Sequence, residues 1–236
     1  MVYGGLKMGE KISIIIPVLN EADEIVDTLK EVNNLRVEGQ KEVIVVDGGS
    51  SDQTIQLAQD WADKVCETEA GRGHQMNYGA KRAQGDILFF LHSDSWLEAG
   101  GLLELERTMQ DSEVIGGSFS LKIANNSWPL RFISWTSNIR AQYLNIIFGD
   151  QGIFVRREVF RKLNGYAEIE LMEDWEFSRR LAQEGRLVQL DHQIYTSDRR
   201  WKENGIWRTI WLMHKIKLLY LLGVEPEKLS EIYRKG

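Results

Sequence analysis

The sequence contains little cysteine and no long apolar run. These absences argue against a disulfide-bonded protein and against a membrane-spanning one. Cys66 is the single cysteine among 236 residues, so an intrachain disulfide is excluded and a reducing compartment is indicated. No stretch of about 18 apolar residues occurs, so no membrane-spanning helix is expected. The opening segment, residues 1–11, lacks the apolar core of a signal peptide. These features predict a cytoplasmic location.

An excess of positive charge is also absent. The formal net charge is −6, with 29 Lys and Arg against 35 Asp and Glu, which argues against a nucleic-acid partner. One segment departs from this average, because residues 199–217 carry six basic side chains and a single acid, Glu203. An anionic ligand or an anionic membrane surface could bind there. The six basic residues are Arg199, Arg200, Lys202, Arg208, Lys215 and Lys217.

Two common nucleotide-binding fingerprints are missing. Neither the Gly48-Gly49 turn nor Gly71-Arg72-Gly73 forms a Gly-x-Gly-x-x-Gly motif, and no Gly-Lys-Ser/Thr phosphate loop occurs. A dinucleotide-dependent dehydrogenase and a P-loop enzyme are therefore disfavoured. The glycine pair would still let the backbone approach a ligand closely, although turn glycines are common.

The elements that are present predict an α/β fold. Residues 12–16, 43–46 and 87–91 are short apolar runs typical of buried strands, and residues 22–35 place apolar side chains at helical spacing. This alternation predicts a mainly parallel sheet with helices on both faces. The other expected elements are a helix after residue 51, a short strand near Val65, strands at 114–123, 153–156 and 187–190, helices at 130–147, 158–163, 174–184 and 205–222, and a last helix opened by Pro226.

Acidic residues follow three of the predicted parallel strands. These are Glu21, Asp47 and Asp94, and parallel strands would bring their ends to one edge of the sheet, where ligands bind in open α/β folds. Asp94 follows a buried strand in the string GDILFFLHSDS. Its carboxylate could hold Mg²⁺ or Mn²⁺ against a phosphate, or it could cap the next helix.

Several strings together resemble the inverting glycosyltransferases of family 2, which have the GT-A fold. They are ISIIIPVLNEADEI, EVIVVDGGSSDQT, GRGHQMNYGAKRAQGDILFFLHSDS, GDQGIFVRREVFRKLNGY and MEDWEFSRRLAQEG. The resemblance covers residues 11–201 in the family's order. It implies transfer of a sugar, with inversion, from a UDP- or GDP-linked donor. It also implies a tail at residues 1–10, a GT-A domain at 11–204 and a helical extension at 205–236 packed on that domain.

The resemblance further implies a set of donor-binding residues. Asp94 would be the last acid of the family's Asp-x-Asp motif and would hold a divalent metal, Mg²⁺ or Mn²⁺, on the diphosphate. Asp47 would bind the nucleoside, and Arg72 would lie near the base or phosphates. The full donor set is Pro17, Asn20, Glu21, Asp47, Gly48, Arg72, Asn77, Ser93, Asp94 and Arg200.

The Glu173-Asp174 pair resembles the family's catalytic acids. Asp174 would be the general base, since the acceptor hydroxyl must lose a proton as it attacks. Alternatively, the pair marks a helix N-terminus, where the helix dipole favours acids. Arg200 could bind the diphosphate and Trp201 could stack on an acceptor sugar. The other reading of these two residues is an arginine paired with surface acids and a tryptophan in the core.

One position departs from the family pattern, because His92 stands where the first acid of the metal motif is expected. It could be a hydrogen-bond donor behind the site, a nitrogen ligand favouring Mn²⁺, or a packed histidine. The departure leaves open an alternative function, a nucleotide-sugar-binding protein with impaired catalysis. A nucleotidyltransferase is disfavoured, since Pro17-Val18-Leu19-Asn20 replaces the glycine-rich basic loop expected there.

The segment at residues 206–222 is basic, amphipathic and rich in tryptophan. It could lie at a membrane interface near a lipid-linked acceptor, on the inner membrane face, or its apolar side could pack against the catalytic domain.

Overall fold

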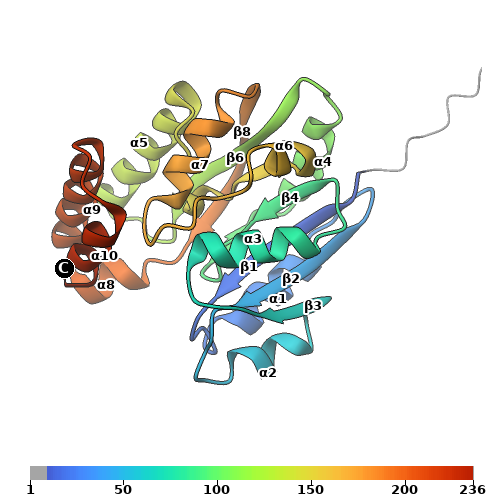
Figure 1. Cartoon of the computed structure of the whole chain (residues 1–236), viewed down its shortest axis with the longest axis horizontal. Helices are drawn as coiled ribbons and strands as arrows, with labels where there is room; N and C mark the ends of the chain where they lie inside the picture. The colour runs from blue at the N-terminus through green and yellow to red at the C-terminus, as the bar shows by residue number, and fades with distance from the viewer. Residues whose placement is uncertain (1–9, 236) are drawn as a thin grey trace, which may run out of the picture.

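A computed structural model describes residues 10–235, so the predicted tail lies outside the described residues except for Glu10. The described chain forms one eight-stranded sheet in the order β3-β2-β1-β4-β7-β6-β8-β5, with helices on both faces (Figure 1). The strands are β1 Ile12–Val18, β2 Lys41–Asp47, β3 Lys64–Glu67, β4 Ile87–Phe90, β5 Ser95–Leu97, β6 Val114–Ile123, β7 Phe154–Arg156 and β8 Arg186–Thr196.

The first four strands, β1 to β4, pair in parallel, as the alternation of strands and helices predicts. β7 then inserts antiparallel between β4 and β6, β8 runs parallel to β6, and β5 closes the edge antiparallel to β8. The helices are α1 Ile25–Asn34, α2 Thr54–Gln59, α3 Arg72–Arg82, α4 Gly101–Met109, α5 Trp128–Leu144, α6 Arg157–Lys162, α7 Glu173–Leu181, α8 Arg199–Asn204, α9 Ile206–Leu221 and α10 Pro226–Lys235, with a 3₁₀ turn, η1, at Gly149–Gln151.

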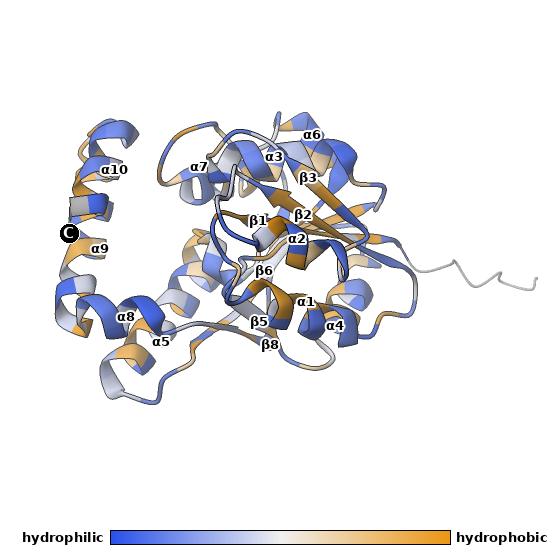
Figure 2. Ribbon diagram, turned by 90° about the horizontal axis from the view of Figure 1, so that it is seen from below, coloured by the Kyte–Doolittle hydropathy of each residue, from blue (hydrophilic) through white to orange (hydrophobic). Residues whose placement is uncertain are grey.

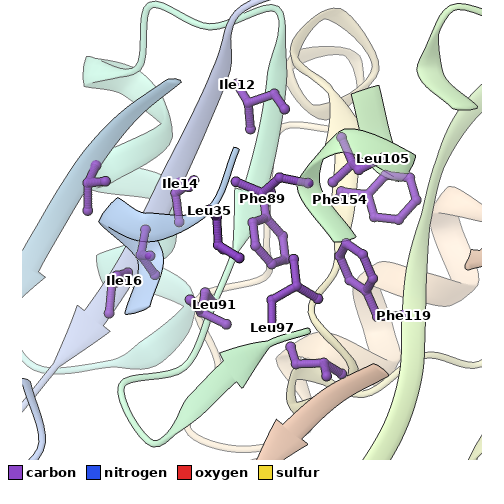
Figure 3. Packing of buried hydrophobic residues seen from close by; sticks show 14 of the residues in the cluster. Ile12, Ile14, Ile16, Leu35, Phe89, Leu91, Leu97, Leu105, Phe119 and Phe154 are labelled. Carbon is purple, nitrogen blue, oxygen red and sulfur yellow. The ribbon is translucent and has the colours of Figure 1, made fainter. Parts of the chain in front are cut away.

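Alternation along β1 builds a core on each face of the sheet. Ile14 and Ile16 join the cluster under α1 and α4, whereas Ile15 joins the cluster under α3, α6 and α7. Figure 3 shows Phe89 and Phe154 within the first cluster. All of these side chains are almost fully buried. The predicted two-faced burial of the sheet is therefore confirmed.

Several boundaries differ from those predicted. Helix α3 forms in the Gly-rich segment, for which no helix was expected, and neither α4 nor β5 was predicted. A Cβ on Gly79 would stand 2.6 Å from a methyl of Ile15, so this glycine lets α3 pack directly on β1. The predicted strand at 187–190 extends to the eleven residues of β8.

The C-terminal helices α8, α9 and α10 lie together at one end of the molecule and pack on the rest of the described chain (Figure 1). Leu212 and Ile216 of α9 belong to one buried cluster with Trp175 of α7, and Trp201 of α8 belongs to another with Leu130 of α5. Within residues 10–235, no helix combines the length and the apolarity needed to cross a membrane.

Candidate active site

A cavity of about 220 Å³ opens beyond the carboxyl ends of β4, β6 and β8. It is the place where open α/β sheets bind ligands. The cavity receives side chains from helices far apart in the sequence, including the last helices of the chain. Its charged and histidine lining consists of Arg72, His92, Asp94, Arg140, Asp150, Glu173, Asp174, Arg200, His214 and Lys217.

Asp174 is held rigidly at the N-terminus of α7. Its Oδ2 accepts a hydrogen bond from the backbone N–H of Gly149 at 2.7 Å, and its Oδ1 accepts one from the N–H of Trp175 at 2.7 Å. The carboxylate therefore lines the cavity in a fixed orientation. Both carboxylate oxygens thus accept a backbone N–H, which fixes the direction in which the side chain points.

Glu173, beside it, has a different environment. Its side chain is 3% exposed, and its Oε1 lies 3.6 Å from Nη1 of Arg72. Burial raises the pKa of Glu173, and the charge of Asp174 raises it further, while Arg72 opposes both effects. The two adjacent acids therefore have different surroundings. Asp174 accepts hydrogen bonds from backbone N–H groups, and Glu173 is buried against an arginine.

Arg72 opens α3 and faces all the acids of the cavity. Its side chain is 52% exposed. Partial desolvation opposes its charge, but Glu173, Asp174, Asp94 and Asp150 favour it, and its pKa lies above the usual value. A cation surrounded in this way stays charged. Its guanidinium can bind a diphosphate in the cavity.

His92 is packed rather than exposed. A Cβ on Gly149 would stand 2.5 Å from Nε2 of His92, so the imidazole lies directly against the Gly149 backbone. Nε2 is buried and has no hydrogen-bond partner among the described residues. Burial lowers the pKa of His92, the charge of Arg72 lowers it further, and Asp94 opposes them. The ring is therefore neutral near pH 7.

The loops after β1 and β2 are tied to each other instead of lining the cavity. Asp47 is fully buried, and its carboxylate accepts hydrogen bonds from the N–H groups of Gly49 and Ser50 and from the Ser50 hydroxyl. Asn20 accepts a hydrogen bond from the N–H of Ser51 at 2.8 Å. Glu21 is ion-paired with Arg199 at 3.4 Å, and burial, the largest effect, raises its pKa.

The structure divides the predicted site residues into two groups. Arg72, Asp94, Glu173, Asp174, Arg200 and Trp201 line the cavity together. Asn77 does not, since its side chain is buried and exchanges two hydrogen bonds with the backbone of Tyr166. The others outside the lining are Pro17, Asn20, Glu21, Asp47, Gly48 and Ser93.

A second charged group lines the cavity and was not predicted from the sequence. Arg140 and Lys217 both lie over the ring of Phe148, at 4.1 and 4.8 Å from its centroid, and Asp150 lies close to both. Burial raises the pKa of Asp150 to about 6 and lowers that of Lys217 to about 8. No short sequence motif indicates this group, because its members come from α5, η1 and α9, which are far apart in the sequence.

A metal site in this cavity would need ligands from the bound molecule. Among residues 10–235 no three His, Cys, Asp or Glu side chains gather as a metal-binding group. Mg²⁺ in phosphate-transferring sites is commonly held by one or two carboxylates and the substrate's phosphates. Asp94, on the cavity wall near Arg72 and Arg200, fits a site of that kind.

Curated relatives of this chain are glycosyltransferases. A PGL/p-HBAD biosynthesis glycosyltransferase from Mycobacterium bovis is 29% identical over 188 residues, covering 75% of this chain and 71% of the relative. Probable glycosyltransferase YdaM from Bacillus subtilis is 26% identical over 224 residues, covering 85% of this chain and 53% of the relative.

Two solved structures share the fold. The mannosyltransferase PcManGT from Pyrobaculum calidifontis, in complex with GDP-Man and Mn²⁺, has a TM-score of 0.69 at 20% identity and covers 89% of this chain. TarS from S. aureus has a TM-score of 0.65 at 20% identity and covers 80% of this chain. This chain spans 62% of the PcManGT chain and 60% of the TarS chain, which comprises residues 1–349. The likeness confirms the predicted GT-A type of fold.

A family model described as Glycosyl transferase family 2 matches residues 13–163. The match covers more than half of the sequence and ends before Glu173 and Asp174, whose roles therefore rest on the geometry of the cavity. The chain belongs to glycosyl transferase family 2 and is a glycosyltransferase.

Proposed function

We propose that this enzyme transfers a sugar, with inversion, from a nucleotide-diphosphate sugar to an acceptor hydroxyl. The observation that carries the proposal is the meeting of two kinds of group in one cavity. A carboxylate fixed by backbone donors, Asp174, shares the cavity with Arg72, Arg200 and Asp94. UDP- and GDP-linked sugars are the proposed donors, and the structures of TarS with UDP-GlcNAc and of PcManGT with GDP-Man support this choice.

The donor diphosphate would lie between Arg72 and Arg200, with the nucleoside toward the loops that contain Asn20, Glu21 and Asp47. Asp94 would hold Mg²⁺ or Mn²⁺ on the phosphates, and the metal would help to neutralise the charge that gathers on the leaving group. Arg72 and Arg200 would also help to neutralise the negative charge of the leaving diphosphate. Pro17, Gly48 and Ser93 would shape the nucleoside side of the site.

Asp174 would act as the general base. Its carboxylate takes the proton of the acceptor hydroxyl while the hydroxyl oxygen forms a bond to the anomeric carbon. The bond from that carbon to the phosphate oxygen breaks on the opposite face, and the diphosphate leaves with the electron pair. Glu173, buried against Arg72, would position the arginine and limit the negative charge at the base.

The acceptor would enter the side of the cavity that the last helices build. Its wall there is apolar and includes Ile133 of α5, Trp201 of α8, and Ile210 and Met213 of α9. A wall of this composition suits an acceptor with an apolar part, including a lipid-linked one. A cytoplasmic location and peripheral contact with the inner membrane face complete the proposal.

Nucleotide release from UDP- and GDP-sugars, with Mn²⁺ present and water as the slow acceptor, tests this function. Asp174→Asn keeps the shape of the side chain and should lower the release rate by about 10²–10⁴-fold while nucleotide binding persists. The matched control is Asp60→Asn, at an exposed position outside the cavity lining, which should release nucleotide at the wild-type rate. Equal rates for wild type and Asp174→Asn would overturn the assignment of the base.

A further inference from the structure

Helices α5 and α9 expose large apolar side chains to solvent. On α5 they recur every three or four residues, at Trp128, Phe132, Trp135, Ile139 and Tyr143, so they form one stripe along the helix. Trp128 is 69% exposed and Tyr143 72%. Soluble surfaces rarely carry so much aromatic surface in one place, which marks an interaction site.

Helix α9 carries a matching stripe. Its members recur at intervals of four or seven residues and are Trp207, Trp211, Leu218 and Leu222, the last of which directly follows the helix. Both tryptophans are 64% exposed. The opposite side of α9 is already occupied, because Leu212 and Ile216 are buried in the core. The exposed stripe therefore remains after the predicted packing of this helix on the domain has been satisfied.

The two stripes meet to form a single surface, here called the aromatic face. The rings of Trp128 and Trp207 contact each other edge to face, with centroids 5.7 Å apart. Behind them, Leu130 and Ile133 of α5 pack in one cluster with Ile210 of α9. The helices that carry the face lie together at one end of the molecule (Figure 2).

The charged side chains of α5 and α9 are all basic. Arg131 of α5 and Arg208 and Lys215 of α9 lie outside the cavity lining, and neither helix carries an Asp or Glu. Nζ of Lys215 lies 5.0 Å from the ring centroid of Trp211. The whole chain nevertheless has a net charge of −6. Basic side chains beside exposed aromatic ones complement an anionic lipid surface.

We propose that the aromatic face binds the interface of an anionic membrane. Tryptophan and tyrosine favour the boundary between headgroups and acyl chains, where an apolar ring and a polar edge are both accommodated. The nearby cations add attraction to anionic headgroups. A second copy of this chain is a poorer partner, because the basic charges of the two copies would repel each other.

Binding of the aromatic face to a membrane would also place the acceptor side of the cavity at the lipid surface. This consequence rests on the proposed transferase function. Ile133 and Arg140 line the catalytic cavity from α5, and Met213 and Lys217 line it from α9. The helices that would contact the lipid thus also form the acceptor side of the site. An acceptor carried on a lipid would reach Asp174 between these helices without leaving the membrane.

Flotation of the intact chain with vesicles tests the proposal. Vesicles of phosphatidylcholine with phosphatidylglycerol should carry the wild-type protein upward, neutral phosphatidylcholine vesicles should carry much less, and added salt should weaken the binding. A variant with Trp128→Ser, Trp135→Ser, Trp207→Ser and Trp211→Ser should bind at least about tenfold more weakly, since each ring loses apolar burial. Trp61→Ser, at another exposed tryptophan away from the face, should float like the wild type.

Three results would overturn the proposal. The folded wild-type protein could stay at the bottom of the gradient with anionic vesicles. The four-serine variant, with a wild-type circular dichroism spectrum, could float as well as the wild type. Light scattering could show a dimer that the four-serine variant lacks, which would assign the face to a second copy. Nucleotide binding is measured separately by thermal shift, so failure of the membrane proposal is distinguishable from failure of the transferase proposal.

Discussion

Gly149 donates its backbone N–H to Oδ2 of Asp174 at 2.7 Å, and its own α-carbon faces the ring of His92. Three separate segments meet there: the loop after β4, the 3₁₀ turn η1 and the start of α7. The orientation of the proposed base therefore depends on a glycine at position 149 and on the histidine packed against it.

Gly149→Ala should lower transfer strongly. The added methyl would stand 2.5 Å from Nε2 of His92, so either the ring or the η1 backbone must shift. A shift of the backbone lengthens the hydrogen bond to Asp174, and misplacement of about 1 Å at a catalytic group can cost on the order of 100-fold in rate. Nucleotide release from the preferred donor measures the loss.

The double variant Gly149→Ala/His92→Ala provides the matched control. Removal of the ring opens the space that the methyl needs, so the double variant should be faster than Gly149→Ala alone. Such coupling is expected between residues in direct contact. Additive losses for the two changes would contradict the role assigned to this contact.

Asp94→Asn should remove the dependence of the reaction on a divalent metal. The wild-type enzyme should lose activity in EDTA and regain it with Mn²⁺. Asp94→Asn should be at least about tenfold slower than the Mn²⁺-loaded wild type, both with Mn²⁺ and in EDTA, because a metal supplies several kcal/mol of charge stabilisation. Asp23→Asn, exposed on the loop after β1, should behave like the wild type. Undiminished wild-type activity in EDTA would show that Arg72 and Arg200 neutralise the diphosphate without a metal.

Asp150→Asn should stabilise the fold at alkaline pH. Burial raises the pKa of Asp150 from 3.8 to about 6, so the folded state binds more protons than the unfolded state between these values. The contribution of Asp150 to stability is therefore full below about pH 4 and is lost as the pH rises through 6. The asparagine variant escapes that loss, and its free energy of unfolding at pH 8 should exceed the wild-type value by on the order of 1 kcal/mol.

Urea unfolding at pH 5 and pH 8 measures this effect. The advantage of Asp150→Asn should be small at pH 5 and larger at pH 8, whereas Asp60→Asn, at an exposed position, should show no such change. A wild-type protein that is more stable than Asp150→Asn at pH 8 would contradict the account. That result would mean that the ionised carboxylate stabilises Arg140 and Lys217 more than its burial costs.

The parallel strands could be predicted because burial on both faces leaves a continuous apolar run. The strand expected at 114–123 coincides with β6. β8 was predicted too short, since Asp191 and His192 interrupt its apolar residues beside a register shift in the pairing with β6. Helix α3 was missed because its glycines mask helical periodicity, although Gly79 is what allows its close contact with β1.

The cavity was only partly predictable for a related reason. Asp94 and Asp174 lie at strand and helix ends, where a local pattern points to them. Arg140, Asp150 and Lys217 become a group only when α5, η1 and α9 come together. The aromatic face was also only partly predictable. The sequence pattern indicated the amphipathic stripe on α9 but not the stripe on α5 that completes the face.

Thermal shift with UDP, GDP, CDP and dTDP, each with Mn²⁺, Mg²⁺ or EDTA, tests whether the cavity binds a nucleotide donor through a metal. A ligand that binds only the folded state raises the melting temperature by mass action. We expect a rise in melting temperature for UDP or GDP that requires the divalent metal and that disappears in Asp94→Asn but not in Asp174→Asn. No shift with any nucleotide and metal would contradict the proposal that this cavity binds a nucleotide-sugar donor.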